Sequence, residues 1–343
     1  MDDAGGGRRG RRPTLTGRLL EIVERAYGLK VATARDLGGS ANLNVLVEAD
    51  IGPVVVRAYR PHATTERVVA IQAARGRLSE RRIPTAPLLA TRTGDPFIAV
   101  GSNVVEVERF VHSEEKMDAV SRVCAALPTL ALIHDALFGL DLGNGACHVQ
   151  FVNYVSPIEL VDMTRVGTER IRAWVPTREE AELAEAADRL AVAATQAQEP
   201  IAALRPQLVH GDYWDNNVLF NRGTIVLVAD LDFMNERLRI DDLALTLYFA
   251  SHLLDDSSAS YAANTLAPLV DAYDAGASTP LSVLERAALP IALARQPLWS
   301  LAVWAALLDD EHAARHHVQG HLAAVQRALE TLNDLAVWQR AFA

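Results

Sequence analysis

The sequence predicts an α+β fold in two lobes, with a β-rich N-lobe followed by an α-helical C-lobe. A chain of 343 residues exceeds the usual size of one hydrophobic core, which favours two lobes or two domains. Short runs of alternating and β-branched residues predominate up to residue 112, whereas helical spacing of apolar residues prevails from residue 113 onward. We therefore expect an N-lobe over 14–112, a C-lobe over 113–343, and a cleft between them.

Residues 1–13 are rich in glycine and arginine, and they predict a disordered basic tail rather than a binding arm. No apolar core follows them, so we expect no signal peptide. The formal net charge of −10 argues against a nucleic-acid binder, because phosphate affinity needs clustered basic charge. This acidity is compatible with a cationic substrate, although many cytosolic proteins are equally acidic. Two cysteines, Cys124 and Cys147, lack metal-ligand spacing and favour a reducing cytoplasm.

The expected N-lobe begins with an amphipathic helix over 14–28. Two runs with period-two or apolar character, 43–48 and 53–59, predict strands joined by a hairpin turn at 49–52. A long helix over 64–80 follows, because its apolar residues return to helical spacing. Short strands separated by glycine- and proline-containing turns complete a small antiparallel sheet, and they are expected near 87–91, 97–100 and 103–111.

Helical spacing dominates the expected C-lobe. Its predicted helices are 115–137, 178–199, 240–254, 258–275, 281–294, 298–309 and 311–341. Two short β-like runs, 208–210 and 225–229, interrupt this pattern and flank the polar stretch 211–217. The longest apolar stretch, 287–308, contains Arg295 and two prolines, so buried helices are favoured over a membrane span.

The polar stretch and its surroundings carry the residues on which the functional prediction depends. The sequence contains His210-Gly211-Asp212, and Asn217 follows Asp212 after five positions. Asp230 lies thirteen positions beyond Asn217, at the end of a β-like run. Carboxylate and amide oxygens are ligands that Mg²⁺ prefers, and a positioned carboxylate can accept a hydroxyl proton. This combination favours a metal-assisted site over a chance arrangement of loop residues.

The segment 208–245 resembles the catalytic core of the aminoglycoside phosphotransferase and choline kinase-like superfamily, whose members are relatives of protein kinases. The resemblance implies a bilobal protein-kinase-like fold. It also implies Mg²⁺-dependent transfer of the γ-phosphoryl group of ATP or GTP to a hydroxyl of a small molecule. Asp212 would then act on the hydroxyl proton, while Asn217 and Asp230 would bind Mg²⁺. Asp232 is a second possible metal carboxylate, since it points to the same side of an alternating strand.

Three histidine and aspartate side chains near this segment are expected to be structural. His210 is expected to pack or form hydrogen bonds rather than transfer protons. Asp242, twelve positions beyond Asp230, is expected to anchor the start of a helix or a loop. His134 resembles a recurrent helix histidine of the superfamily and is also expected to be structural.

The resemblance assigns nucleotide binding to the N-lobe. The segment 37–44, with Gly39, Ser40 and Asn42, resembles the phosphate-covering loop of the superfamily, and a plain hairpin turn is the alternative. The following strand normally carries a lysine that holds the α- and β-phosphates, whereas this sequence has Arg57 at the matching position. Arginine offers bidentate phosphate contacts but differs from lysine in length and shape. This departure leaves the choice between ATP and GTP open.

Further nucleotide-site residues are expected from the same resemblance. Glu66, on the helix after Arg57, is expected to form an ion pair with it, and Glu80 is the alternative. The strand over 105–111 resembles the hinge between the lobes. Backbone groups at Glu108 and Phe110 are therefore expected to meet the adenine edge.

The acceptor is expected to lie against the C-lobe helices, where Asp215, Arg295 and Trp299 are candidates by location alone. Antibiotics of the aminoglycoside kind, amino alcohols and sugars are all substrates within this fold, so the fold does not select among them. A protein kinase is not expected, because a helix begins within about ten residues of Asp230 and leaves no room for an activation segment. Neither nucleic acid nor membrane is expected as a partner, and the protein is expected to be a monomer or homodimer.

Two other functions remain open at this point. One is a metal-dependent hydrolase that uses Asp230, Asp232 and His210. The other is a catalytically silent nucleotide-binding homologue, which the change to Arg57 favours.

Overall fold

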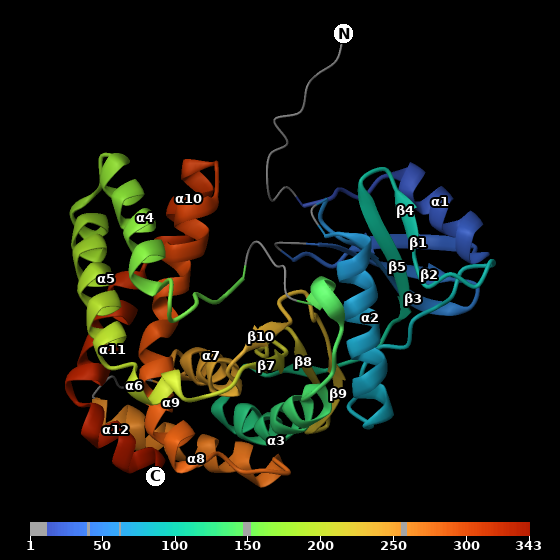
Figure 1. Cartoon of the computed structure of the whole chain (residues 1–343). Helices are drawn as coiled ribbons and strands as arrows, with labels where there is room; N and C mark the ends of the chain where they lie inside the picture. The colour runs from blue at the N-terminus through green and yellow to red at the C-terminus, as the bar shows by residue number, and fades with distance from the viewer. Residues whose placement is uncertain (1–11, 40–41, 62, 147–151, 255–258) are drawn as a thin grey trace.

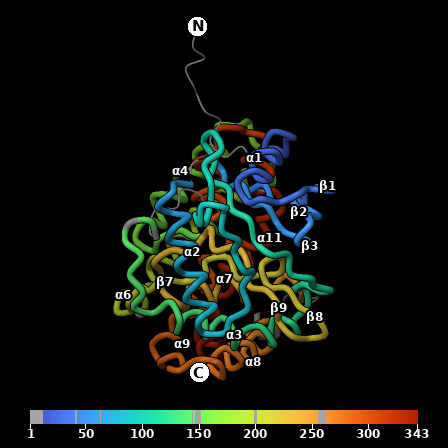
Figure 2. The backbone as a smooth tube through the Cα atoms, turned by 90° about the vertical axis from the view of Figure 1, so that its right-hand side faces the viewer, coloured from blue at the N-terminus to red at the C-terminus, as the bar shows by residue number. Residues whose placement is uncertain are grey.

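The computed structural model describes residues 12–39, 42–61, 63–146, 152–254 and 259–343. A sheet with two helices forms the N-terminal part, and the C-terminal part is mainly helical, so the predicted α+β class is confirmed (Figure 1). The C-terminus lies among the helices on the side away from the sheet, as both views show (Figure 1, Figure 2).

Five antiparallel strands form the N-terminal sheet in the order β1-β2-β3-β5-β4. The strands are β1 (Val31–Asp36), β2 (Leu43–Ala49), β3 (Gly52–Ala58), β4 (Ile98–Val100) and β5 (Asn103–Arg109). Helix α1 (Gly17–Tyr27) covers one face, where Val45, Val54 and Val107 are fully buried. Helix α2 (Thr65–Glu80) packs its apolar side into the core shared with the C-terminal part.

The hairpin and the α2 helix agree with the sequence prediction, while two strands do not. Strand β1 was not predicted, because its outward residues leave little apolar alternation. The strand expected over 87–91 is reduced to one isolated bridge between Leu88 and Glu108. Among the described residues, the sheet is therefore completed by β1 rather than by that strand.

The C-terminal part contains ten α-helices among its described residues. They are α3 (Val120–Leu137), α4 (Leu160–Ala173), α5 (Arg178–Gln196), α6 (Glu199–Ala202), α7 (Arg239–Ser251), α8 (Ala259–Gly276), α9 (Val283–Arg295), α10 (Glu311–Val318), α11 (His321–Asn333) and α12 (Leu335–Phe342). The short strands are β6 (Glu115–Lys116), β7 (Gln207–Val209), β8 (Val218–Asn221), β9 (Thr224–Val228) and β10 (Asn235–Arg237). Strand β6 pairs with β8, and β10 pairs with β7.

Several predicted helices of this part need correction. The helix expected over 311–341 is three helices, because Gly320 takes a left-handed φ of +75° and α11 ends before Asp334. The segment expected as an α-helix over 298–309 is helical, but its central residues, Ser300–Ala305, form a π-helix. Helix α4 was not predicted at all.

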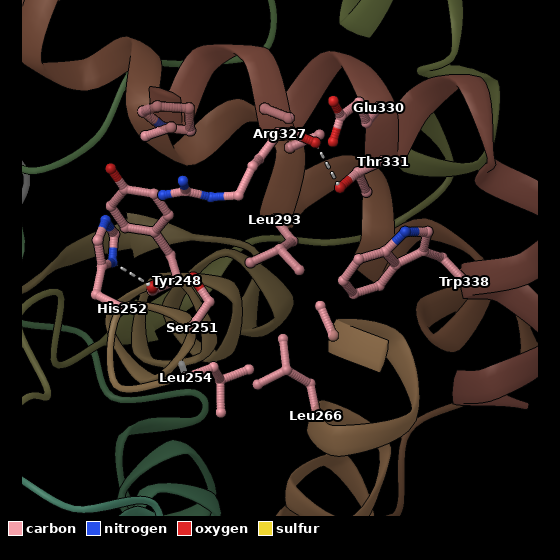
Figure 3. Close-up of a pocket in the computed structure, with 15 residues that line it drawn as sticks. Tyr248, Ser251, His252, Leu254, Leu266, Leu293, Arg327, Glu330, Thr331 and Trp338 are labelled. Atoms are coloured by element: carbon pink, nitrogen blue, oxygen red, sulfur yellow. Dashed lines mark hydrogen bonds between the residues drawn. The ribbon is translucent and has the colours of Figure 1, made fainter. Parts of the chain in front are cut away.

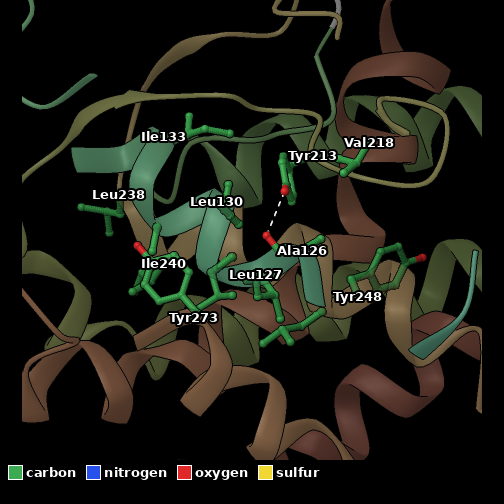
Figure 4. Close-up of a cluster of buried hydrophobic side chains, with 14 of the residues drawn as sticks. Ala126, Leu127, Leu130, Ile133, Tyr213, Val218, Leu238, Ile240, Tyr248 and Tyr273 are labelled. Atoms are coloured by element: carbon green, nitrogen blue, oxygen red, sulfur yellow. Dashed lines mark hydrogen bonds between the residues drawn. The ribbon is translucent and has the colours of Figure 1, made fainter. Parts of the chain in front are cut away.

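Helix α3 lies in the main core of the molecule and supports the loop that carries Asp212 (Figure 4). Leu127, Leu130 and Ile133 are fully buried there. Tyr213, next to Asp212, donates its hydroxyl to the carbonyl oxygen of Ala126 at 2.9 Å. By length and composition α3 is the one described helix that could span a membrane, and half of it is buried inside the molecule.

Candidate active site

The loop between β7 and β8 carries the His-Gly-Asp motif, and a glycine is required at its centre. Gly211 has a φ of +82°, in the left-handed region that favours glycine. A Cβ atom at this position would lie 2.2 Å from the carbonyl oxygen of Phe233. The missing side chain therefore lets the motif loop pack directly against the segment that follows β9.

Asp242, in the first turn of α7, anchors this loop from within the core. Its carboxylate oxygens accept the backbone N–H groups of His210 and Gly211, each at 3.0 Å. The Oδ2 atom of Asp242 also lies 3.0 Å from Nε2 of His134. Burial raises the pKa of Asp242, but the hydrogen bond from His134 and the positive charge of Arg237 help to outweigh burial, so the pKa is lowered. These contacts agree with the structural roles expected for Asp242 and His134.

His210 links the motif loop to the end of β9. Its Nδ1 accepts the backbone N–H of Asp212 at 3.2 Å, and its Nε2 lies 3.0 Å from the carbonyl oxygen of Ala229. Since a carbonyl only accepts, Nε2 carries the proton and the ring is neutral. Burial lowers the pKa of His210, which also favours the neutral ring. The side chain is thus committed to holding the loop, as expected.

Two amide side chains hold Asp212, the predicted base. Nδ2 of Asn217 donates to Oδ2 of Asp212 at 2.8 Å and to its backbone oxygen at 2.9 Å. Nδ2 of Asn153 donates to Oδ1 at 2.9 Å. Burial, together with the negative charge of Asp230, raises the pKa of Asp212 to about 8. Asn153 was not predicted, because no local signal connects it to a loop so distant in sequence.

Asp230 and Asp232 lie together at the end of β9, opposite Arg57 of β3. Nη1 of Arg57 lies 3.5 Å from Asp230 and 3.7 Å from Asp232. Asp230 has a φ of +62°, so the chain turns sharply at this carboxylate. Burial raises its pKa, but the charge of Arg57 outweighs burial and lowers it. Burial and the neighbouring Asp230 raise the pKa of Asp232 to about 6.

The oxygen atoms around Asp230 fit a hard divalent cation. Nδ2 of Asn217 is used by Asp212, which leaves its amide oxygen as the atom for a metal. The Oδ1 atom of Asp232 is buried and has no hydrogen-bond partner among the described residues. Asn217 is tied to this segment, because its carbonyl accepts the N–H of Ala229 at 2.8 Å. Two carboxylates and one amide are a donor set that suits Mg²⁺, which takes further ligands from water and phosphate.

The predicted ion pair between Arg57 and Glu66 is wrong. Thr64 caps α2 by accepting the N–H of Arg67, which puts Glu66 in the exposed first turn of the helix. The alternative, Glu80, also fails, since it pairs with Arg77 at 3.4 Å. Among the described residues, the carboxylates that form ion pairs with Arg57 are instead Asp230 and Asp232 of the C-terminal part.

The helix α2 contributes arginines, rather than a glutamate, to the buried charges of the N-terminal part. Arg75 forms ion pairs with Glu106 at 2.8 Å and with Glu108 at 2.6 Å. The backbone of Glu108 pairs within the sheet, so its predicted contact with adenine does not fit the structure. Phe110 follows the last residue of β5 and donates its N–H to Pro53 at 3.2 Å. The sequence had not singled out Arg75 or Glu106.

The glycine-containing loop before β2 joins the two parts of the molecule. Gly39 has a φ of +106°, which a side chain would strain, whereas Ser40 lies outside the described residues. Nδ2 of Asn42 donates to Asp232, and its Oδ1 accepts the N–H of Arg60 at 3.2 Å. Arg67 of α2 makes a parallel connection, because it donates to the carbonyl oxygen of Asp232 at 2.9 Å. Both connections end on the predicted metal segment.

A model of the phosphotransferase enzyme family, APH, matches residues 33–278, which is more than half of the chain. The chain belongs to this family. The resemblance stated for 208–245 is therefore confirmed, and the protein is a small-molecule kinase. Homoserine kinase of Phenylobacterium zucineum (strain HLK1) is 25% identical over 260 residues, which cover 74% of this chain and 73% of that protein.

Solved structures of low sequence identity share the fold. A microcompartment-associated aminopropanol kinase superposes with a TM-score of 0.71 at 17% identity, covering 94% of this chain and 99% of that one. Amicoumacin kinase, in complex with AMP-PNP, Ca²⁺ and its ligand, has a TM-score of 0.67 at 12% identity and covers 90% and 92%. An aminoglycoside phosphotransferase of Alicyclobacillus acidocaldarius gives 0.67 at 14%, with coverage of 97% and 99%.

The acceptor residues predicted for this kinase do not share one site. Asp215 and Trp299 both line a largely apolar cavity of about 310 Å³, beside the stacked rings of Trp214 and Phe249. Arg295 does not line that cavity. It is buried and forms an ion pair with Asp241 at the start of α7.

A second cavity, of about 260 Å³, lies among α7, α8, α9, α11 and α12 (Figure 3). Leu254, Leu266 and Leu293 point into it, and Trp338 closes one side. No residue predicted for the active site lines it. Tyr248 and His252 line both of these cavities.

Proposed function

We propose that this kinase transfers the γ-phosphoryl group of ATP to a hydroxyl of a small molecule in a Mg²⁺-dependent reaction. One observation carries the proposal. Asp212 is held on both carboxylate oxygens by amides, and one of these amides belongs to Asn217, which is hydrogen-bonded to the segment of Asp230. Base and metal ligands are thereby fixed to one another before any substrate binds.

Asp212 is the group that receives the proton. The acceptor oxygen bonds to the γ-phosphorus, the bond from that phosphorus to the bridging oxygen of ADP breaks, and the hydroxyl proton passes to Asp212. Asn153 and Asn217 orient the carboxylate for this contact. Burial raises the pKa of this carboxyl, which makes it a stronger proton acceptor than an exposed aspartate.

Asn217, Asp230 and Asp232 would hold the metal. Mg²⁺ supplies neutralisation of the charge on the phosphates when it is bound. Arg57 would hold the α- and β-phosphates in place of the usual lysine. Its guanidinium then has to turn away from the two carboxylates that it neutralises in this structure.

The acceptor is proposed to be a small hydroxyl metabolite, in keeping with the homoserine kinase relative and the aminopropanol kinase neighbour. An aminoglycoside-like antibiotic is the alternative. A cytoplasmic location and a monomeric or homodimeric state remain predictions.

The test is a measurement of ADP formation by the purified protein across a panel of hydroxyl compounds, with ATP or GTP and with Mg²⁺ or EDTA. We expect acceptor-dependent turnover that requires Mg²⁺ and prefers ATP. Metal-dependent phosphate release with no acceptor requirement would instead favour the hydrolase. Nucleotide binding without turnover on any acceptor would favour the catalytically silent homologue.

A further inference from the structure

A second group of charged side chains lies beside Asp212, and the phosphoryl chemistry leaves it unused. It consists of Arg237 on β10, Asp241 in the first turn of α7, and Arg295 at the end of α9. All three are nearly inaccessible, with exposed fractions of 2%, 1% and 3%. Full charges are rarely buried to this extent, since burial is costly unless each polar atom finds a partner.

Each of the three side chains keeps one polar atom without a hydrogen-bond partner among the described residues. These atoms are Nε of Arg237, Oδ2 of Asp241 and Nε of Arg295. The ion pair between Arg295 and Asp241 joins Nη2 to Oδ1, so it does not involve Nε of Arg295 or Oδ2 of Asp241. Two donors and one acceptor therefore remain unsatisfied in one buried cluster, where each costs free energy.

Arg237 is the least compensated of the three. No described carboxylate lies within 4.0 Å of its guanidinium, which donates to the carbonyl oxygen of Phe233 at 2.9 Å. The guanidinium also lies over the ring of Tyr154, whose centroid is 4.6 Å from the guanidinium carbon, and the carboxylates of Asp242 and Asp241 act on it from farther away. A cation–π contact recovers only part of the lost hydration.

The cluster borders the base directly. Strand β10 pairs with β7, the strand that leads into the His-Gly-Asp loop. A Cβ atom on Gly211 would lie 2.8 Å from Nη2 of Arg237, so the guanidinium touches the residue before Asp212. On the other side, Asn153 donates to Asp212 and is followed by Tyr154, which covers Arg237.

We propose that this cluster is the charge-recognition subsite for the acceptor, and that the acceptor is a small zwitterion. The two guanidinium Nε–H groups would bind its carboxylate, and Oδ2 of Asp241 would bind its ammonium group. A ligand with only one charge leaves part of the cluster unsatisfied, and so the subsite selects a hydroxy amino acid over a simple amino alcohol or hydroxy acid. This inference rests on the proposed kinase function and adds the class of its acceptor.

Three compounds with the same hydroxypropyl chain test the proposal on the wild-type protein. They are L-homoserine, which carries both charges, 3-aminopropan-1-ol, which lacks the carboxylate, and 4-hydroxybutyrate, which lacks the ammonium group. We expect kcat/KM from ADP formation to be at least about tenfold higher for L-homoserine than for either of the others. Equal values, or a preference for a singly charged compound, would overturn the zwitterion subsite while leaving the kinase function intact. No turnover with any hydroxyl compound of the wider panel would count against the kinase function itself.

Variants then assign the two charges. Arg237→Gln is expected to raise KM for L-homoserine about tenfold and to remove its advantage over 3-aminopropan-1-ol, with KM for ATP unchanged. Asp241→Asn is expected to remove the advantage over 4-hydroxybutyrate. Arg178→Gln is the matched control, because Arg178 is exposed and contacts only Glu182 among the described residues. Thermal melting with and without ATP identifies a variant that fails to fold, in which case the wild-type comparison decides.

The cavity that contains Asp215 provides the opposing outcome. Asp215→Asn is expected to leave the preference among the three compounds unchanged. Loss of the preference in this variant, with Arg237→Gln retaining it, would move acceptor recognition to that cavity and overturn the proposal.

Discussion

Around the His-Gly-Asp loop, Asp242 accepts hydrogen bonds from two backbone N–H groups, and Gly211 lets the backbone of Phe233 pack against the loop. Across from it, Arg57 of the N-terminal part is paired with two carboxylates that the proposed reaction needs for a metal. In the first region the backbone N–H groups of the loop have their acceptors within the core, whereas the second region holds charges that must exchange partners. We infer that the C-lobe side is assembled in advance and that the N-lobe side rearranges when nucleotide binds.

The largest effect on stability is expected from Gly211→Ala, which disturbs the packing of the C-lobe side. The new Cβ would meet the carbonyl oxygen of Phe233 in a backbone conformation that disfavours side chains. We expect the free energy of unfolding to fall by about 4 kcal/mol in urea titration. Gly223→Ala is the control, since Gly223 has a similar φ of +74° but open space around it, and about 1 kcal/mol is expected there. Similar costs for the two would show that the close packing at Gly211 contributes little.

Removal of the anchor should come next. Asp242→Ala leaves the N–H groups of His210 and Gly211 buried without an acceptor, so we expect a loss of about 3 kcal/mol at pH 7. Because its folded pKa is lowered, Asp242 stabilises the wild type above its unfolded pKa of about 3.9, and this contribution disappears as the pH falls through the folded pKa. The difference between wild type and variant should therefore shrink below about pH 4. A constant difference down to pH 2 would contradict the anchor role of the charge.

On the N-terminal side, Arg75 and Glu66 separate the observed charge network from the predicted one. Arg75→Gln leaves Glu106 and Glu108 unpaired, and a loss of about 2 kcal/mol is expected. Glu66→Gln changes an exposed helix residue, so its effect is expected to stay within about 0.5 kcal/mol. A large effect of Glu66→Gln on stability or on KM for ATP would restore the ion pair predicted from the sequence.

The smallest effect concerns Arg57 and the metal. Removing its charge in Arg57→Met should tighten Mn²⁺ binding to the nucleotide-free protein about tenfold, because the tethered cation no longer competes for Asp230 and Asp232. Electron paramagnetic resonance of free Mn²⁺ measures this without turnover. Arg109→Gln, on the neighbouring strand, is the control, since Arg109 is exposed and donates to a backbone oxygen. Unchanged or weaker Mn²⁺ binding in Arg57→Met would mean that the arginine does not compete with the metal for the two carboxylates.

The sequence predicted those parts of the molecule whose partners are close in the chain. The β2–β3 hairpin follows from alternation and a short turn, and the contact between Asp212 and Asn217 follows from a motif within one loop. Helix α2 was also predicted, but which of its charges face the sheet depends on how the helix docks. The family resemblance suggested Glu66, whereas docking brings Arg75 to the sheet.

The remaining site residues come from distant segments. Asn153 reaches Asp212 from a segment far earlier in the chain, and Arg237 meets Gly211 only because β10 pairs with β7. Neither contact produces a spacing pattern in the sequence from which it could be predicted. Arg295 was suggested as an acceptor residue by location. Its ion pair with Asp241 could not be predicted, because the two residues are distant in the sequence.

The central claim is that Asp212, Asn217 and Asp230 form one phosphoryl-transfer site, and the variant Asp212→Asn tests it most directly. Acceptor-dependent ADP formation and the affinity for ATP should be measured side by side on the same preparation. The account predicts that kcat falls by about 10³-fold, since a general base is lost, while ATP affinity changes less than about threefold. Turnover close to that of the wild type would contradict it.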